Sequence, residues 1–420
     1  MWKISPLTLV APFALLMAAC THGPPMDRRP EARYDFSRAF AVLDSAISDR
    51  ITPGAQVYIS QGGVTLVDTG IGRFTYKEAA PPVTPASIYD LASLTKVLVG
   101  ATVAMKLVEG RYILLDEPIQ NYFPAFKGRW KEQVTLRHLL THSSGLPWYE
   151  KYWELGIKPH EVLGTIIRAE LTFQPGTDYV YSDLGLILFT ALAELTTGKK
   201  IEQLAREWVF EPLKMEHTGY RPPVEWLDDI VPTEVFNDNL RRGLTRGTVH
   251  DRNTYFLGGI SLHAGVFASA NQLAKLGHMV LDGGLANGQR LVQRETIAEF
   301  IRPQEMPPDS GRALAWQLAS ATASAGDFFS PPSFGHTGFT GTSIWIDPER
   351  DLVVVLFTNR VHPSRERGDH KGIRQAFHNE VVRAVDPTAS AVAAKQSKMD
   401  RGTPEGRPVR PSIRPVRGGR

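Results

Sequence analysis

The sequence predicts an α/β protein of the α+β type, in which an antiparallel sheet is flanked by helices and carries a mainly helical inserted region. Strand patterns gather towards the two ends of the chain, at residues 55–70 and 343–358, and helix and loop patterns fill the part between them. We therefore expect one domain whose α/β part covers about 36–100 and 290–386 and whose helical part covers about 101–289. Ligand pockets often form between two such parts, so we expect a binding cleft there.

The first elements are a helix and a hairpin. Apolar residues recur at helical spacing at Phe36, Phe40, Leu43 and Ile47. Two strand patterns follow, and Gln61-Gly62-Gly63 between them predicts a turn. This part of the chain is therefore expected to supply the first helix and the first two strands.

The last elements are a second hairpin and a helix. A turn at Asp347-Pro348 separates the strand pattern Ser343–Ile346 from the strand pattern Leu352–Thr358. The second of these patterns is apolar throughout, which is typical of a central strand that is covered on both faces. A helix from about Ile373 to Val385 closes the domain.

Charge is unevenly placed along the 420 residues, although the net charge is only +3. From Lys395 to the end there are eight lysines and arginines against two acidic residues, so the rest of the chain has a net charge of −3. A weakly acidic body argues against nucleic-acid binding. We expect residues 387–420 to form a disordered basic tail, because they hold few large apolar residues.

The N-terminal segment, residues 1–20, has the pattern of an export signal, in which Lys3 precedes an apolar stretch too short to span a bilayer. The small residues before Cys20 resemble the lipobox of bacterial lipoproteins; a plain secretory signal is the alternative. Residues 21–35 are expected to form a tether. We therefore expect an exported protein of the bacterial cell envelope, lipid-anchored at Cys20 and facing the periplasm. Cys20 is the one cysteine, so disulfides and cysteine-based metal sites are excluded.

The functional interpretation begins at Ser93-Leu94-Thr95-Lys96. Asp90 can cap a helix that runs apolar to Gly110, which places Ser93 in the first turn and Lys96 on the same face. A lysine in an apolar pocket loses its proton more easily and can act as the base for a serine that is unreactive alone. A surface Ser-x-x-Lys is the alternative, because chance produces this pattern in most chains of this length.

Two further motifs lie in segments that can reach one cavity. Tyr181-Ser182-Asp183 stands in a loop at the start of an apolar helix, where Tyr181 and Asp183 can face the same side. A buried structural tyrosine is the alternative there. His336-Thr337-Gly338 precedes the second hairpin, and its glycine allows a backbone N–H to lie against a ligand.

A pair of histidines raises the question of a metal. His138 and His142 lie four residues apart in a predicted helix, a spacing that puts two ligands on one face. No carboxylate follows at zinc-site spacing, so we prefer structural histidines that bond loop backbone and expect no metal.

In this order the three motifs resemble those of the penicillin-recognising serine hydrolases. The second and third motifs are most similar to the class C β-lactamase-like and DD-carboxypeptidase branch, which includes cell-wall amidases and esterases. Leu140–Leu146 and Pro175–Thr177 are similar to that branch as well. The resemblance covers about Phe36 to Val385. It implies a β-lactamase/transpeptidase-like fold and acyl transfer without a metal or an organic cofactor.

The resemblance also implies a role for each matching residue. Ser93 is the expected acylated nucleophile, Lys96 the group that takes its proton, and Tyr181 the phenol that shuttles protons. The backbone N–H groups of Ser93 and Phe339 form the expected oxyanion hole. The expected substrate-binding residues are Asp183, His336, Thr337 and Gly338.

Asp183 departs from the asparagine that is usual in penicillin-binding relatives. An amide can donate to a substrate carbonyl, whereas an ionised carboxylate only accepts. Beside Lys96, a carboxylate also raises the pKa of the lysine, against a free-base role. These properties disfavour β-lactam turnover and favour a substrate that presents an amine or an N–H group at this point.

We expect hydrolysis, through a Ser93 acyl-enzyme, of amide bonds in peptidoglycan-derived peptides, as a DD-carboxypeptidase or a muramyl-L-alanine amidase. Thr358–Pro363 and Arg246–Asp251 resemble the subgroup of cell-wall peptidases and muramyl-peptide amidases. The alternatives are a carboxylesterase or weak class C-like β-lactamase, and a non-catalytic lipoprotein that binds muropeptide or β-lactam. A binder needs no proton chemistry, which argues against the last. The expected partners are a peptide or muropeptide and a membrane, but no nucleic acid; the oligomeric state stays open.

Overall fold

The computed structural model describes residues 34–320, 323–366 and 368–389. The expected export signal with Cys20, the tether up to residue 33 and the basic tail from residue 390 therefore lie outside the described residues. Within the described part, no helix has both the length and the apolar character needed to cross a membrane. The account below concerns the unit that begins at Phe36.

The main sheet has six antiparallel strands in the order β10-β11-β12-β13-β1-β2. Their bounds are β1 Gly54–Gln61, β2 Val64–Gly72, β10 Gln317–Leu318, β11 Phe334–Thr337, β12 Ser343–Asp347 and β13 Leu352–Thr358. Both expected hairpins are confirmed, as β1–β2 and β12–β13. Gly62 and Gly63 have positive φ angles of 58° and 73°, which the first turn requires and which glycine adopts without strain.

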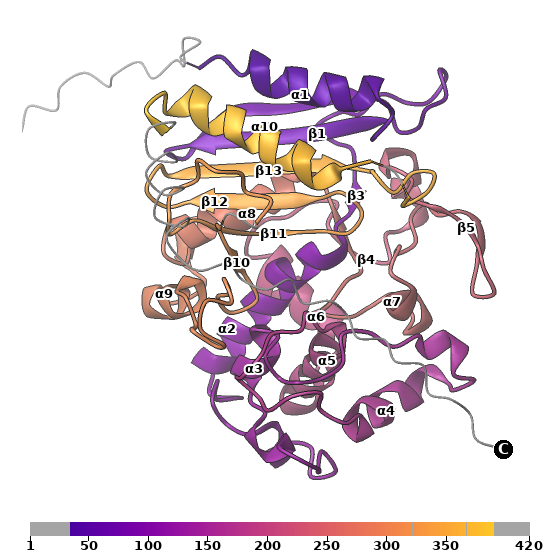
Figure 1. Ribbon diagram of the computed structural model, residues 1–420, viewed down its shortest axis with the longest axis vertical. Coiled ribbons are helices and arrows are strands. Elements are labelled where there is room, and N and C mark those ends of the chain that lie inside the picture. The colour runs from indigo at the N-terminus through magenta and orange to yellow at the C-terminus, as the bar shows by residue number, and fades with distance from the viewer. Residues whose placement is uncertain (1–33, 321–322, 367, 390–420) are drawn as a thin grey trace, which may run out of the picture. The chain divides into compact units, whose positions relative to one another are not determined.

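Helices cover both faces of this sheet, and Figure 1 shows α1 and α10 lying along one of them. The α-helices of the described residues are α1 Ser37–Ser48, α2 Thr102–Glu109, α3 Leu136–Leu140, α4 Val162–Arg168, α5 Asp183–Thr197, α6 Ile201–Ala205, α7 Arg252–Phe256, α8 Ala270–Leu281, α9 Arg294–Ile301 and α10 His370–Val385. On the α1–α10 face, Leu43 and Phe377 share a core with Val354. On the other face, Leu273 of α8 shares a core with Val355. Strand β13 alternates between the two cores and is buried throughout, so the expected central strand is confirmed.

Short strands join the loops of the helical region. They are β3 Tyr89–Asp90, β4 Gly219–Tyr220 and β7 Val266–Ala268 in one sheet, with the pairs β5 Val235–Asn237 and β6 Arg242–Leu244, and β8 Leu285–Ala286 and β9 Gln289–Arg290. Pairing of Tyr89 with Ala268 and of Asp90 with Phe267 brings the segment before Ser93 against a strand that lies far along the chain. This contact positions the candidate site.

Two boundaries differ from those expected. Helix α8 lies within the range that the sequence assigned to the helical part, but it packs on the main sheet. A Cβ at Gly277 of α8 would touch the side chain of Val353, so the helix and the sheet are in direct contact. At the other end, Ala389 is buried and belongs to the α1–α10 core. The α/β part therefore includes α8 and extends a few residues beyond 386.

The segment that carries Ser93 is helical, but it is not the single α-helix that the sequence predicts. A 3₁₀ turn at Ala92–Leu94 leads into a π-helical stretch at Lys96–Ala101, and α2 begins only after it. Leu91 is the N-cap residue of this turn, and Asp90, one position before it, accepts the N–H of Ala92 with its Oδ1 at 2.8 Å, so Asp90 still pairs with the first N–H group of the turn. Ala92 has a φ of 47°. Left-handed non-glycine residues and π-turns are uncommon and concentrate at functional sites.

Candidate active site

Lys96 is buried, with 1% of the residue exposed, and its Nζ has three oxygen partners. It donates to Ser93 Oγ at 2.9 Å and to the carbonyl of His263 at 2.8 Å, and it pairs with Asp183 Oδ1 at 2.8 Å. The first two contacts are hydrogen bonds, and the third is an ion pair. Burial alone would lower the pKa of Lys96, but the interactions of the lysine with Asp183 and Tyr181 together outweigh burial and raise it above its ordinary value. Lys96 is therefore a charged donor to Ser93, and not the neutral base that an apolar pocket would favour.

Tyr181 lies beside this pair, with its ring centroid 5.0 Å from Lys96 Nζ. The ring of His142 packs against it at a centroid distance of 4.4 Å. His142 Nδ1 in turn accepts the N–H of Ser182 at 3.1 Å, and Ser182 Oγ caps α5 by accepting the N–H of Gly185. The second motif is therefore fixed at the start of α5, with Asp183 as the first residue of the helix.

The expected pairing of His138 and His142 on one helical face is wrong. Helix α3 ends at Leu140, and His142 lies beyond it with a φ of 59°. His138 Nδ1 takes part in the capping box of Thr135 at the start of α3, whereas His142 supports Tyr181. Both are structural histidines bonded to nearby backbone, the interpretation that the sequence favoured.

The third motif ends strand β11 next to the serine. Thr342 Oγ1 donates to the carbonyl of Leu91 at 3.0 Å, and Thr340 Oγ1 donates to the carbonyl of Asp90 at 2.7 Å. These two bonds hold the turn after Gly338 against the segment that precedes Ser93. A Cβ at Gly338 would collide with Thr342 Oγ1 and with the carbonyl of Leu91, so this approach requires a glycine.

His336 is buried in this strand, with 3% exposed. Its Nδ1 donates to the carbonyl of Thr337 at 2.9 Å. Burial, together with the charges of Arg312 and Lys96, holds the pKa of His336 well below its usual value, so the ring is neutral. Its Nε2 is buried without a hydrogen-bond partner among the described residues, which leaves an acceptor for a substrate N–H or O–H group.

Phe339 follows as an exposed side chain, 47% accessible, over the edge of the cleft. Its ring stacks on His250 at 5.6 Å, and His250 Nε2 bonds Glu234 at 2.8 Å. His250 also donates its backbone N–H to Asp90 Oδ2 at 2.6 Å. Asp90 therefore connects the cap of the Ser93 turn to the residue that supports Phe339.

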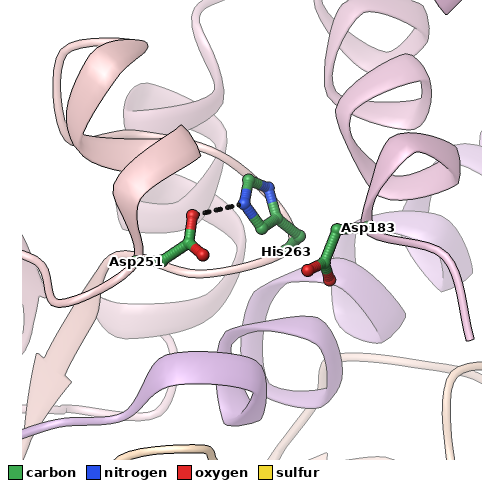
Figure 2. A group of neighbouring side chains, drawn as sticks. All are labelled: Asp183, Asp251 and His263. Carbon is green, nitrogen blue, oxygen red and sulfur yellow. Dashed lines mark hydrogen bonds and ion pairs between the residues drawn. The ribbon is translucent and has the colours of Figure 1, made fainter. Parts of the chain in front are cut away.

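The sequence did not predict a role for Asp251 and His263, although Asp251 lies in a run of four polar residues, His250-Asp251-Arg252-Asn253. Figure 2 shows the carboxylates of Asp183 and Asp251 on either side of the His263 ring, with Asp251 bonded to it. The bond joins His263 Nε2 to Asp251 Oδ1 at 2.9 Å, and His263 Nδ1 bonds Ser261 Oγ at 2.7 Å. Because the carbonyl of His263 holds Lys96, this network positions the lysine.

Asp183, Asp251 and His263 each offer a ligand atom within 4.8 Å of the others, so they form a group that could hold a metal ion. Two observations argue against that use. Both ring nitrogens of His263 already have partners, and the ammonium of Lys96 pairs with Asp183 at 2.8 Å. A divalent cation would have to break these bonds beside a like charge. The donor set fits a hydrogen-bond network better than a metal site.

Two adjoining cavities open at Ser93, and both are also lined by Tyr181 and Phe339. The first, of about 740 Å³, extends past Asp183 and Asp251 to the aromatic residues around Trp148. The second, of about 550 Å³, extends past His336, Thr337 and Gly338 to a group of basic residues. The structure thus brings the expected site residues together around one divided cleft, with Lys96 buried behind it.

Comparison with known proteins agrees with this geometry. The family model described as "Beta-lactamase" matches residues 43–377. A Salmonella typhi protein named "Putative D-alanyl-D-alanine carboxypeptidase" is 29% identical over 307 residues, which cover 66% of this chain and 71% of that protein. A solved penicillin-binding protein homologue from Caulobacter crescentus superposes with a TM-score of 0.65 at 18% identity, over 82% of this chain and 97% of that chain. A family VIII carboxylesterase superposes with a TM-score of 0.64 at 20% identity, over 83% and 97%. This chain therefore belongs to the beta-lactamase family and is a serine hydrolase.

Proposed function

We propose that the protein hydrolyses amide bonds in peptidoglycan-derived peptides through an acyl-enzyme on Ser93, as a DD-carboxypeptidase or a muramyl-L-alanine amidase. The observation that carries the proposal is the set of contacts around Lys96 Nζ, which holds Ser93 Oγ at 2.9 Å and Asp183 at 2.8 Å. The curated relative named as a carboxypeptidase supports the amide substrate.

In this mechanism Ser93 Oγ attacks the carbonyl carbon, and the N–H groups of Ser93 and Phe339 stabilise the oxyanion that forms. Lys96, which is charged, lowers the energy of the developing negative charge on Ser93 Oγ. Tyr181 relays the serine proton to the leaving nitrogen, and the C–N bond breaks to leave the Ser93 ester. Water then attacks the ester, and Tyr181 relays its proton back to Ser93.

Asp183 is the reason for preferring an amide with a free N–H or amine over a β-lactam. Its carboxylate is 18% exposed at the wall of the first cavity and accepts hydrogen bonds only. A substrate carbonyl placed against it would meet an acceptor and be repelled, whereas an N–H group would be bound.

A carboxylesterase is a second candidate. The similarity in fold to a family VIII carboxylesterase favours it. The leaving oxygen of an ester also depends less on prior protonation than the leaving nitrogen of an amide does. Comparing the hydrolysis of p-nitrophenyl acetate with that of muropeptides separates the two, because a true esterase turns over the ester with a much higher kcat/KM.

The decisive experiment incubates the purified protein with a muropeptide mixture and identifies the products by mass spectrometry, since each bond cleaved leaves a distinct fragment. Ser93→Ala should remove all products, and Ser45→Ala, an exposed serine on α1, should remove none. Loss of a single C-terminal residue indicates the carboxypeptidase activity, and release of the whole peptide indicates the amidase activity. Undiminished cleavage by Ser93→Ala would contradict the proposal.

A further inference from the structure

The two cavities of the cleft differ in how their charges are balanced. The cations of the first cavity are Lys151, Arg252 and Arg365. Each of them has an ion-pair partner: Lys151 pairs with Glu154 at 3.2 Å, Arg252 with Asp238 at 2.8 Å and Arg365 with Glu234 at 2.6 Å. The first cavity therefore needs no charged group from a substrate.

The second cavity is lined by four cationic side chains, Arg312, Arg360, Lys371 and Arg374, and by one carboxylate, Asp369. Over the residues that the structure describes, the ion pairs include none of these four cations. Asp369 caps α10, where its Oδ1 accepts the N–H of Gly372 at 2.9 Å. The four cations gather with little compensating charge, which is unfavourable unless an anion joins them.

The hydrogen bonds of these arginines hold the side chains in place but leave some of their N–H groups without an acceptor. Arg374 Nη2 donates to the carbonyls of Gly338 and Thr342, and Arg360 Nε donates to the carbonyl of Phe339. Arg312 Nη1 and Arg374 Nε are buried with no partner among the described residues. Buried donors of this kind are normally paired, so two of them in one cavity wall indicate a missing acceptor.

The charges influence one another, as expected when they share a poorly solvated cavity. Burial, with a contribution from Arg360, lowers the pKa of Arg374 to about 9, so Arg374 keeps its proton at neutral pH. Burial and the charges of Arg374 and Arg360 hold the pKa of His370 well below its usual value. The histidines in the cavity wall are therefore neutral, and the positive charge resides on the lysine and the three arginines.

We propose that the second cavity binds a dianionic part of the substrate, namely an acidic amino-acid residue that carries both a free α-carboxylate and a side-chain carboxylate. A single carboxylate would leave most of the charge of the cavity unbalanced, whereas two carboxylates reduce it to about one net positive charge. The cavity begins at Ser93 and Tyr181, so this residue adjoins the scissile bond. The proposal rests on the proposed amide hydrolysis and specifies the peptide that is cleaved: its last residue is acidic, so the residue released is an acidic amino acid and not D-alanine.

The test measures binding without turnover, by calorimetry with the Ser93→Ala protein at low ionic strength. The ligands are N-acetyl-D-alanyl-D-glutamate, its amide counterpart N-acetyl-D-alanyl-D-glutamine, and phenyl phosphate, which is a dianion but not a peptide. We expect the glutamate peptide to bind at least ten times more tightly than the glutamine peptide, and the ratio to fall with added salt. Equal affinities, or no binding of either peptide, overturn the proposal. Tighter binding of phenyl phosphate than of the glutamate peptide overturns the assignment to a peptide.

Lys371 provides a variant that leaves the catalytic residues untouched, because it is exposed on the first turn of α10. Lys371→Gln should reduce the glutamate-to-glutamine ratio several-fold, and Lys371→Glu should reduce it further. Lys77→Gln, an exposed lysine outside both cavities, should leave the ratio unchanged. Turnover of muropeptides by the wild type is measured separately, so failure of the amide hydrolysis and failure of dianion binding give different results.

Discussion

Lys96 Nζ and Asp183 Oδ1 form an ion pair of 2.8 Å at the base of the cleft, with side-chain exposures of 1% and 18%. The charge of Asp183 raises the pKa of Lys96 against the effect of burial. For a lysine with a raised folded-state pKa, the favourable contribution to stability is complete below the unfolded value and is lost as the pH rises through the folded value. The pair is therefore fully formed at neutral pH, where it restricts how Lys96 can take part in catalysis.

The first prediction is that Asp183→Asn makes the site react faster with penicillins and more slowly with its native amide. The variant removes the negative charge beside Lys96, so the pKa of the lysine should fall, and the amide can donate to a β-lactam carbonyl. One pKa unit corresponds to about 1.4 kcal/mol, so an increase of about tenfold in acylation is expected. Single-turnover labelling with a fluorescent penicillin across pH measures it.

The matched control is Asp238→Asn, which also removes a carboxylate from the first cavity but does not touch Lys96. It should leave the labelling rate and its pH profile unchanged. If the wild type labels as fast as Asp183→Asn at every pH, Asp183 does not restrict the site.

The second prediction is that Gly338→Ala inactivates the enzyme by separating β11 from the Ser93 segment. Its Cβ would collide with backbone and with a buried hydroxyl, neither of which can move without breaking the bonds that hold the turn. Overpacking of this kind costs about 1–3 kcal/mol of stability, and the displaced Phe339 N–H should reduce kcat more than tenfold.

The control is Gly219→Ala in β4, where a Cβ meets nothing within 4 Å. Thermal unfolding and kcat of both variants are compared. Normal kcat in Gly338→Ala would show that the close approach of the third motif to the Ser93 segment does not matter for catalysis.

The sheet and the three motifs were predictable because their signals are local. The apolar run of β13 and the turn at Gly62-Gly63 each identify an element from a few neighbouring residues. The three motifs also keep a fixed order along the chain, which is what made the resemblance specific. The position of α8 against the sheet was not predictable, since its apolar face suits either part of the domain.

The rest of the site depends on contacts between residues that are distant in sequence. His263 is 167 positions from the lysine that its carbonyl holds, and Asp90 is 160 positions from His250. Contacts between residues so far apart leave no recognisable pattern in a single sequence. The 3₁₀ and π turns around Ser93 were missed for a similar reason. They occur in a buried segment next to the left-handed Ala92, and the apolar period of that segment looks the same as that of an α-helix.

The third prediction is that chelators leave the activity unchanged. Asp183, Asp251 and His263 lie close enough to bind a cation, but their ligand atoms are engaged with Lys96, Ser261 and one another. Turnover after dialysis against EDTA should match that of the untreated protein, and added Zn²⁺ should not raise it. Metal-dependent recovery of activity would show that the network rearranges to bind an ion.

The last prediction concerns Asp90 and the acid side of the pH profile. Burial raises the pKa of Asp90 to about 6, against the opposing effect of the N–H groups of His250 and Ala92 that it accepts; Asp251 adds to the rise and Arg241 reduces it. Below about pH 6 the protonated carboxyl is a weaker acceptor and carries an O–H group of its own, so its bonds to the two N–H groups should weaken and the Ser93 turn and the support of Phe339 should loosen. We expect kcat/KM to fall below about pH 6.

Stability should respond in the opposite direction to activity at this residue. Because the folded-state pKa is above the unfolded value, the cost of keeping Asp90 ionised appears as the pH rises from about 4 to about 6 and is constant above that. The contribution of Asp90 to stability is therefore greatest at low pH, where activity is lost. Glu234 has the opposite effect: burial would raise its pKa, but the bonds from His250 and Arg365 lower it from 4.5 to about 2, so its contribution to stability is lost as the pH falls from about 4.5 to about 2. Because the two effects oppose each other, the pH dependence of the unfolding free energy does not isolate the contribution of Asp90.

Asp90→Asn separates these effects. An amide keeps one acceptor but does not titrate, so the variant should have a lower kcat/KM at pH 8 and no acid limb near pH 6. Glu234→Gln serves as the control, because it also removes a carboxylate beside His250. The pKa of Glu234 is about 2, far below that of Asp90, so this variant should keep the fall in kcat/KM near pH 6. Rates measured from pH 5 to pH 8 with one substrate test the assignment. An unchanged limb in Asp90→Asn would show that another group controls it, and Asp90 would then be only a structural cap.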